Sequence, residues 1–439
     1  MRNIFKDGSV DNIYKLEGRV PLLSAIPFGL QHIWAMFVAN IAPVLIVATA
    51  CNLSESETAY LVQCAMFIAG IGTLFQLYPK FRIGSGFPIV MGISFTFVSV
   101  LCVIGANFGY PACIGAVIVG GIFEGTFGLF AKYWRRLISP IVAASVVTSI
   151  GFSLLNVGAT SFGGGSGSPD FGSFRNLFLG SVTLLSCILF SIFAKKKWKP
   201  LSILFGLVVG YIIAVVIGAV DFSSLSDTRI IAFPRILPYK PEFNIGAIVS
   251  VALIYLVSAA ETIGDTSVIS AAVLKRPATD KEISGAITCD GYISALSGII
   301  GAIPITSFSQ NIGIIAVTKV VNRFTIFTGA VIMILAGFFP VIGAALATLP
   351  EAVLGGCTIM LFGNIVLSGI QMLSDCGFTQ RNVTIAALSL SIGLGFTQVS
   401  DIFCNMPVII QNIFAQNCVA IVFVLAIAMN LILPKDEKN

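Results

Sequence analysis

Charged side chains are scarce in this sequence. Only 10 % of its 439 residues are Asp, Glu, Lys or Arg, whereas a soluble domain carries about 25 %. Hydrophobic residues make up 56 % and the mean hydropathy is +0.98. Such a chain has too few polar side chains to cover a water-exposed surface, so we predict a polytopic membrane protein. At about 20 residues per span, the chain has room for roughly 12 to 14 membrane segments.

Residues that build metal sites and activate nucleophiles are equally scarce. His32 is the only histidine, and the ten cysteines are scattered, mostly within apolar runs, and never form a CxxC pair. This pattern argues against a disulfide framework or a metal site, and we interpret the cysteines as small core residues. An intramembrane enzyme would need a nucleophile or a metal set. We therefore expect neither an enzyme nor a bound cofactor or metal.

Two local features exclude further classes. The Gly- and Ser-rich stretch 158–173 lacks the Gly-Lys-Ser/Thr ending of a phosphate-binding loop, so ATP-driven transport is not expected. The basic run 195–199 follows an apolar segment and is interpreted as an anchor at the inner membrane surface, not as a nucleic-acid patch. The first 20 residues are polar and charged, so no cleavable signal peptide is predicted.

The apolar runs predict an all-α membrane protein with 14 segments. The predicted segments cover residues 27–50, 58–78, 87–105, 111–131, 137–157, 177–194, 201–219, 245–271, 284–302, 303–320, 324–347, 352–371, 383–400 and 412–433. Lys and Arg accumulate in the inner loops of membrane proteins. With the N-terminus inside, the outer loops keep only Arg175, Arg229, Arg235 and Lys240 of the 25 Lys and Arg residues. This bias predicts a multi-pass protein of the cell membrane with both termini in the cytoplasm.

Fourteen segments divide into two sets of seven, and an odd number per set gives the second set the opposite orientation. We predict a first inverted repeat over residues 1–219, an outer connection over 220–243 that carries three prolines, and a second inverted repeat over 244–439. In each repeat the third segment is abnormal: residues 84–95 and 303–311 mix Gly or Pro with Ser and Phe. Paired interrupted segments in corresponding positions point to the substrate site of a transporter.

The second interrupted segment is too polar and too broken for a plain membrane helix. Pro304 and Gly313 flank it, so an extended stretch should end near Ser307 to Gln310 and a helix should begin near Asn311. Irregular backbone at bilayer depth persists only beside protein or a water-filled cavity. A half-helix whose amino end faces such a cavity, with the neutral amides of Gln310 and Asn311 at its mouth, suits a small polar substrate.

Carboxylates at membrane depth are costly and therefore mark functional candidates. Glu261 and Asp265 stand four residues apart, so they project from one face of the eighth segment, and their mutual repulsion favours a proton being held there. A pair that serves packing alone is the alternative. Asp290 is a third candidate. Glu124, beside Gly125, is more typical of a helix contact, and Glu351 suits the start of an outer helix.

Two motifs resemble the nucleobase-ascorbate transporter family, also called nucleobase:cation symporter-2. Gln31-His32 matches the Gln-His pair of its first segment, and residues 310–319 match its signature of Gln, Glu or Pro followed by Asn-x-Gly-x4-Thr-Lys/Arg. The likeness covers essentially the whole chain. It implies 14 segments in two inverted repeats, a core domain and a gate domain, and short antiparallel strands in segments 3 and 10.

The resemblance also implies a substrate. Gln310, where uracil carriers have Glu, together with Glu261, Asp265 and the Asp290-Gly pair, is similar to the bacterial xanthine and uric acid permeases. It implies that the residues that bind the purine are Glu261, Gln310, Phe95, Ser94 and Asn311. It implies that the residues that support binding or proton coupling are Asp265, Asp290, His32 and Gln31. Ile312 and Lys319 depart from the best-known pattern and leave the choice of purine open.

We therefore expect secondary active uptake of xanthine and/or uric acid by proton symport, with the purine, the proton and the lipid bilayer as partners and with a homodimer as the working unit. Nucleic acid is not an expected partner. Three alternatives remain: a uracil or pyrimidine carrier, a sodium-coupled carrier, and an anion channel or exchanger of related architecture. Glu261 and Asp265 would repel an anion, and the Gln310-Asn311 pair offers no cation to hold one.

Overall fold

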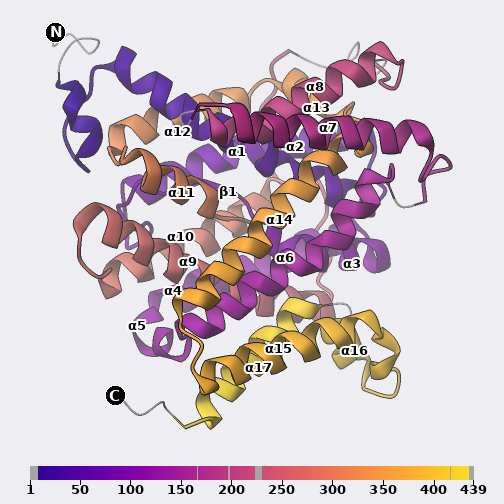
Figure 1. The fold of residues 1–439 in the computed structure, drawn as a ribbon. Coiled ribbons are helices and arrows are strands. Elements are labelled where there is room, and N and C mark those ends of the chain that lie inside the picture. The colour runs from indigo at the N-terminus through magenta and orange to yellow at the C-terminus, as the bar shows by residue number, and fades with distance from the viewer. Residues whose placement is uncertain (1–7, 166, 196–197, 223–229, 416, 435–439) are drawn as a thin grey trace.

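The computed structural model describes residues 8–165, 167–195, 198–222, 230–415 and 417–434, and almost all of them lie in helices or tight connections (Figure 1). Some residues used for the orientation, and residues 223–229 of the outer connection, lie outside the described part. The Lys and Arg residues concerned are Arg2, Lys6, Lys196, Lys197, Arg229, Lys435 and Lys438.

The first half of the chain consists of η1 (Val10–Tyr14), α1 (Leu22–Ala50), α2 (Glu55–Leu77), β1 (Met91–Ile93), η2 (Phe95–Phe97), α3 (Val98–Phe108), α4 (Tyr110–Leu129), α5 (Ala131–Trp134), η3 (Arg135–Leu137), α6 (Pro140–Phe162), α7 (Phe174–Phe193), η4 (Lys199–Leu201) and α8 (Ser202–Val216). The second half consists of α9 (Ile245–Leu274), α10 (Asp280–Ile299), β2 (Ile305–Ser307), α11 (Ser309–Thr318), α12 (Arg323–Ala336), α13 (Pro340–Ala347), α14 (Glu351–Asp375), α15 (Gln380–Gln398), η6 (Ser400–Phe403), α16 (Val408–Phe414) and α17 (Cys418–Ile432).

The predicted class, an all-α membrane protein with short strands in two segments, is confirmed. Among the described residues, eight helices are long and apolar enough to cross a membrane, and a ninth if α12 and α13, bent by 78°, form one span. The remaining predicted segments coincide with the two strand-containing segments, with the more polar α10 and α15, and with the divided α16–α17. The count of fourteen crossings stays a prediction.

The two strands pair at the centre of the fold. β1 and β2 run antiparallel, with Met91 opposite Ser307 and Ile93 opposite Ile305. The predicted end of the extended stretch is confirmed at Ser307, while α11 begins at Ser309, two residues before the predicted start. The earlier start is possible because the first amides of a helix need no intrahelical partner, so a helix can begin within a polar stretch.

A two-stranded sheet has two open edges, and unpaired backbone groups at membrane depth are costly. Side chains from three helices close these edges. Asn40 of α1 accepts from the Ile93 amide at 2.7 Å, and Thr73 of α2 accepts from the Met91 amide at 2.9 Å. Ser294 of α10 accepts from the Ile305 amide at 3.1 Å. These bonds hold both strands, and therefore the half-helices that follow them, in fixed positions.

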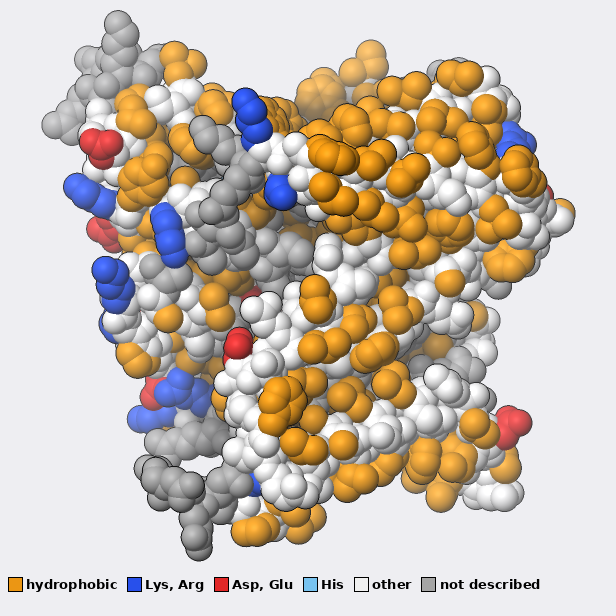
Figure 2. Space-filling view, viewed as in Figure 1, with side chains coloured by type: hydrophobic (Ala, Val, Ile, Leu, Met, Phe, Trp, Pro, Cys, Tyr) orange, Lys and Arg blue, Asp and Glu red, His pale blue; other side chains and the backbone are white. Residues whose placement is uncertain are grey.

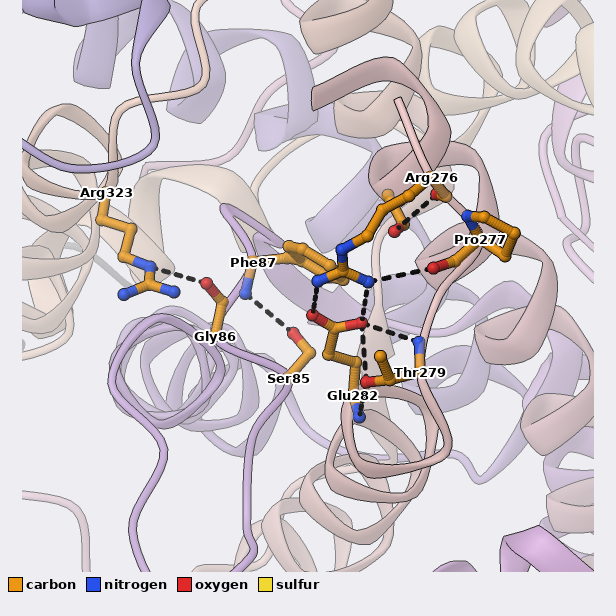
Figure 3. Close-up of polar contacts among 9 residues, drawn as sticks. Ser85, Gly86, Phe87, Arg276, Pro277, Thr279, Glu282 and Arg323 are labelled. Atoms are coloured by element: carbon orange, nitrogen blue, oxygen red, sulfur yellow. Dashed lines mark hydrogen bonds and ion pairs between the residues drawn. The ribbon is translucent and has the colours of Figure 1, made fainter. Parts of the chain in front are cut away.

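An ion pair stabilises the turn between α9 and α10. Arg276 forms a two-bond contact with Glu282 at 2.6 and 3.0 Å, and Thr279 and Glu282 form a capping box at the start of α10 (Figure 3). Burial alone would raise the pKa of Glu282, but the hydrogen bonds from Arg276 and Thr279 lower it below its ordinary value. Nearby, Arg323 donates to the Gly86 carbonyl at 2.6 Å and so ties the start of α12 to the approach to β1.

The N-terminal segment is bound to the junction of α11 and α12 by Asn322. This fully buried side chain caps α12 through its oxygen, and its nitrogen lies 2.9 to 3.1 Å from the carbonyls of Asn12, Lys15 and Gly18. Asn322 therefore holds the segment that carries Tyr14 against the start of α12.

Replacing Asn322 by Ala should lower the stability of the protein. The change removes a helix cap and the donor group that the carbonyls of Asn12, Lys15 and Gly18 share, at a cost of about 1 to 3 kcal/mol. Thermal unfolding of the purified protein in detergent should show a lower midpoint, with the exposed Gln380→Ala as the matched control. Equal midpoints for the two variants would show that the N-terminal segment contributes nothing to stability.

Basic and hydrophobic side chains occupy different parts of the molecular surface. Figure 2 shows Lys and Arg gathered at the end where α10, α11 and the N-terminal segment lie, and a broad hydrophobic surface over α7 and α14. The large exposed side chains of α7 include Phe174, Phe178, Leu185 and Ile192. A continuous apolar surface beside a basic rim is the arrangement expected of a protein embedded in a bilayer.

Candidate functional site

A cavity of about 1500 Å³ lies beside the strand pair. One wall comes from α1, the two interrupted segments and α9, and the opposite wall comes from α6, α8 and α14. The cavity extends to Tyr14, Lys199 and Thr318, which border the predicted inner loops. This conformation is therefore open toward the side that carries most of the Lys and Arg residues.

Six of the nine side chains selected from the sequence line this cavity. They are Gln31, Ser94, Phe95, Glu261, Asp265 and Gln310. The other three, His32, Asp290 and Asn311, are buried behind the wall and do not line it. The structure thus brings together residues that lie up to 279 positions apart in the sequence and separates the set into a lining layer and a supporting layer.

The two carboxylates of α9 are each held by one interrupted segment. Thr96 donates to Glu261 at 2.8 Å, and Ser309 donates to Asp265 at 2.8 Å. Each bond uses one carboxylate oxygen, so acceptor capacity remains for a ligand in the cavity. Thr96 and Ser309 are the neighbours of Phe95 and Gln310, so the same short stretches orient the acids and present the predicted ligand-binding residues.

Phe95 and Gln310 each lie shortly after one of the two paired strands. Phe95 opens η2 two residues after the end of β1, and its ring meets Phe362 of α14 edge-on at 5.4 Å between centroids. Gln310 lies in the first turn of α11, is exposed to the cavity, and follows Ser309. An aromatic face and a free amide therefore face the same space as Glu261.

Asp290 holds the backbone at the end of β2. It is fully buried and accepts hydrogen bonds from Thr262 at 2.5 Å, from Gln76 at 3.1 Å, and from both the amide (3.2 Å) and the hydroxyl (3.1 Å) of Ser307. A carboxylate with this many donors is well satisfied in its ionised form. Its position fixes the end of β2, two residues before Ser309 and three before Gln310.

His32 and Asn311 join α1 to α11. The Asn311 side chain donates to the His32 carbonyl at 3.3 Å, and both residues are at least 97 % buried. Within the described part of the chain, His32 Nδ1 and Asn311 Oδ1 have no hydrogen-bond partner. In this conformation the pair supports the wall of the cavity, while the adjacent Gln31 faces it.

Thr96, Ser309, Gln76 and Thr262 were missed by the sequence analysis. Hydroxyl and amide residues are common in membrane helices, and nothing in their local spacing marks them. Thr96 and Ser309 have one recognisable signal, because each directly adjoins a residue already predicted to face the ligand.

Comparison with known proteins identifies this arrangement. A family model described as "Permease family" matches residues 23–402. The chain belongs to the nucleobase-ascorbate transporter family. It is 35 % identical to the xanthine permease XanQ of Escherichia coli K12 over 450 residues, covering 99 % of this chain and 96 % of that protein. It is 31 % identical to the uric acid permease PucJ of Bacillus subtilis over 398 residues, covering 89 % and 88 %. Family members are transporters, so this multi-pass membrane protein is a transporter and not an enzyme.

Solved structures support the fold alone. The murine anion transporter Slc26a9 in its inward-facing state aligns with a TM-score of 0.64 at 10 % identity, covering 93 % of this chain and 68 % of that one. The transmembrane domain of the cyanobacterial bicarbonate transporter BicA aligns with a TM-score of 0.56 at 16 % identity, covering 93 % and 97 %. Both are membrane transporters, in agreement with the architecture of a core domain that faces a gate domain.

Proposed function

We propose that this permease takes up a purine nucleobase, xanthine and/or uric acid, by proton symport. The observation that carries the proposal is the convergence of a carboxylate, an amide and an aromatic ring on one cavity, from three elements distant in sequence: Glu261, Gln310 and Phe95. Relatives named as xanthine and uric acid permeases support the purine assignment.

Glu261, Gln310 and Phe95 are chemically complementary to a xanthine-type ring. Such a ring alternates N–H donors and carbonyl acceptors around a flat apolar face. Glu261 accepts N–H groups, Gln310 both donates and accepts, and the Phe95 ring packs against the face. Ser94, next to Phe95, adds a hydroxyl at the same wall. Asp290, Asn311 and His32 support these groups from behind.

The carboxylates also favour a coupling cation. Glu261 and Asp265 lie on one face of α9 at membrane depth, where two bare charges are costly. Holding a proton beside them, together with a neutral purine, lowers that cost. The loaded core domain would then move against the gate domain across contacts such as Phe95 with Phe362, and the working unit is a homodimer with both termini in the cytoplasm.

Uptake by carrier-deficient cells tests this proposal. Cells that produce the protein should accumulate labelled xanthine or uric acid above the empty-vector level, and a protonophore should abolish the accumulation. Guanine and uracil serve as competing substrates, and removal of sodium serves as the coupling control. Uptake of uracil alone, or uptake that depends on sodium and resists the protonophore, would overturn the assignment.

An anion transporter is the second candidate, because both solved relatives carry anions. The cavity argues against it. Within the described residues its wall carries Glu261 and Asp265, and its single cationic side chain, Lys199, lies toward the inner loops. Labelled bicarbonate or chloride uptake in the same cells should therefore equal the vector control.

Replacing Gln310 by Glu should shift the preference toward uracil-like ligands or abolish transport. The change replaces a mixed donor and acceptor by an acceptor only, and it puts a third carboxylate beside Glu261 and Asp265. Loss of one matched hydrogen bond corresponds to about a tenfold weaker apparent affinity for xanthine. Competition by unlabelled bases, corrected for the amount of protein in the membrane, measures the shift. Unchanged xanthine uptake and selectivity would remove Gln310 from the ligand set.

A further inference from the structure

Among the described residues, Glu124 and Asp290 are the two fully buried acids, and Glu124 has no evident purpose in packing. It lies on α4, in the group of α4, α9 and α10 (Figure 1), and its side chain is completely buried. Among the described residues, neither of its carboxyl oxygens has a hydrogen-bond partner. The sequence alone favours a helix contact for Glu124, but such a contact normally satisfies its polar atoms.

The position of Glu124 places it behind the acids of the site. α4 packs closely on α10, since a methyl group added at Gly291 would come within 2.7 Å of the Glu124 carbonyl carbon. Gly291 directly follows Asp290. On α9 the Ser258 hydroxyl faces the Glu124 carboxyl and likewise lacks a hydrogen bond.

The charged and titratable groups around Glu124 leave it without a counter-charge. Asp290 of α10, Glu261 of α9 and Tyr255 of α9 lie within electrostatic reach. No Lys or Arg of the described residues interacts with it. A bare carboxylate in that place would be repelled by two acids and would face a single neutral hydroxyl, that of Ser258. Glu124 therefore carries a proton in this conformation.

The other acids are less suited to hold that proton. Asp290 accepts hydrogen bonds from Thr262, Gln76 and Ser307, so its neighbours stabilise the ionised form. Glu261 must act as an acceptor if it binds purine N–H groups. A symporter carries substrate and proton together, and a proton on the acceptor oxygen of Glu261 would compete with the purine.

The spacing of residues along α9 offers a route between the two glutamates. Ser258 precedes Glu261 by three residues on α9, and residues three apart lie on the same helix face. Its hydroxyl both donates and accepts, so it can pass a proton from a Glu261 oxygen to a Glu124 oxygen while taking a replacement from Glu261. The proton leaves one carboxyl and arrives on the other, and no further reactant is needed.

We propose that Glu124 is the residue that holds the transported proton while the ionised Glu261 binds the purine, with Ser258 as the relay. This inference rests on the proposed symport function. It separates two tasks that the sequence analysis assigned to one group of acids, and it adds a residue to the coupling machinery from a helix that contributes nothing to the cavity lining.

Proteoliposomes with purified protein separate the two tasks. Glu124→Gln keeps the size of the side chain and removes the exchangeable proton. With an inward proton gradient, this variant should accumulate labelled xanthine at least about tenfold less than the unmodified protein, because a carrier without its coupling ion only equilibrates its substrate. It should still exchange internal unlabelled xanthine for external labelled xanthine. Glu124→Asp should restore part of the accumulation, and Ser258→Ala should reduce its initial rate.

Glu351→Gln, at the outer start of α14, is the matched control and should keep both accumulation and exchange. Two results would overturn the proposal. One is accumulation by Glu124→Gln equal to that of the unmodified protein. The other is loss of exchange together with accumulation in correctly inserted Glu124→Gln protein, which would assign Glu124 to binding or structure. If Glu124→Gln does not insert, unchanged accumulation by Ser258→Ala overturns the relay. Absence of xanthine and uric acid exchange in the unmodified protein would instead refute the proposed function.

Discussion

Replacing Glu261 by Gln should reduce xanthine uptake by about 10- to 100-fold. The reason is the loss of a charged acceptor, since a hydrogen bond to a charged group contributes about 1.5 to 3 kcal/mol and about 1.4 kcal/mol is a factor of ten in affinity. The Gln amide would also turn a donor toward Thr96 or toward the purine. Initial uptake rates, with the amount of protein in the membrane as a correction, measure the effect.

The exposed Glu242→Gln, in the outer connection, is the matched control for the Glu261 change and should transport at the unmodified rate. Binding of labelled xanthine to purified protein separates lost affinity from lost movement. If Glu261→Gln keeps the affinity for xanthine and the uptake rate of the unmodified protein, then the Glu261 carboxylate is structural. Its role would then be limited to accepting the hydrogen bond from Thr96.

Replacing Asp290 by Asn should weaken transport about as strongly as Glu261→Gln does, although the Asp290 side chain does not line the cavity. All its contacts come from donors, and an Asn side chain would set its NH2 group against at least one of Thr262, Gln76 and Ser307. A buried donor left without an acceptor costs about 1 to 3 kcal/mol, and loss of the charge adds to that. The end of β2 would shift and move Gln310 with it, so uptake should fall by about tenfold or more.

Asp265→Glu is the comparison for Asp290→Asn. It keeps the charge on α9 and lengthens the side chain by one methylene. Ser309, which donates to this carboxylate, lies at the cavity surface and has room to adjust to the longer side chain. The effect of Asp265→Glu should therefore be the milder one. Initial xanthine uptake against external pH, with surface expression as control, compares the two. An Asp290→Asn variant with the unmodified rate and pH profile would assign Asp290 to packing and leave coupling to α9 and its neighbours.

The sequence predicted the parts of the fold that depend on local chemistry. Pro304 and the polar stretch after it marked the strand and half-helix, and the spacing of Glu261 and Asp265 put both on one face of α9. The predicted segment 324–347 instead breaks between Ala336 and Pro340, where Gly337 and Pro340 end one helix and start another. The segment 412–433 is likewise divided, because Asn417 caps a new helix, α17.

From the sequence, only those site residues could be predicted whose side chains are individually unfavourable in a membrane. A carboxylate at membrane depth is conspicuous in any sequence, so Glu261, Asp265 and Asp290 were found. The partners Thr96, Ser309 and Gln76 lie 165, 44 and 214 positions from the acids that they bind. No local pattern connects such distant residues, and the division into a lining and a supporting layer follows from tertiary packing.

A structure of the protein with bound xanthine would test directly whether Glu261, Gln310 and Phe95 bind the purine. We predict a flat ligand in the cavity beside Phe95, with one edge within hydrogen-bond distance of the Glu261 carboxylate and the Gln310 amide. We also predict that the bonds from Thr96 to Glu261 and from Ser307 to Asp290 remain intact. Xanthine bound elsewhere, or a cavity that stays empty at saturating xanthine, would contradict it.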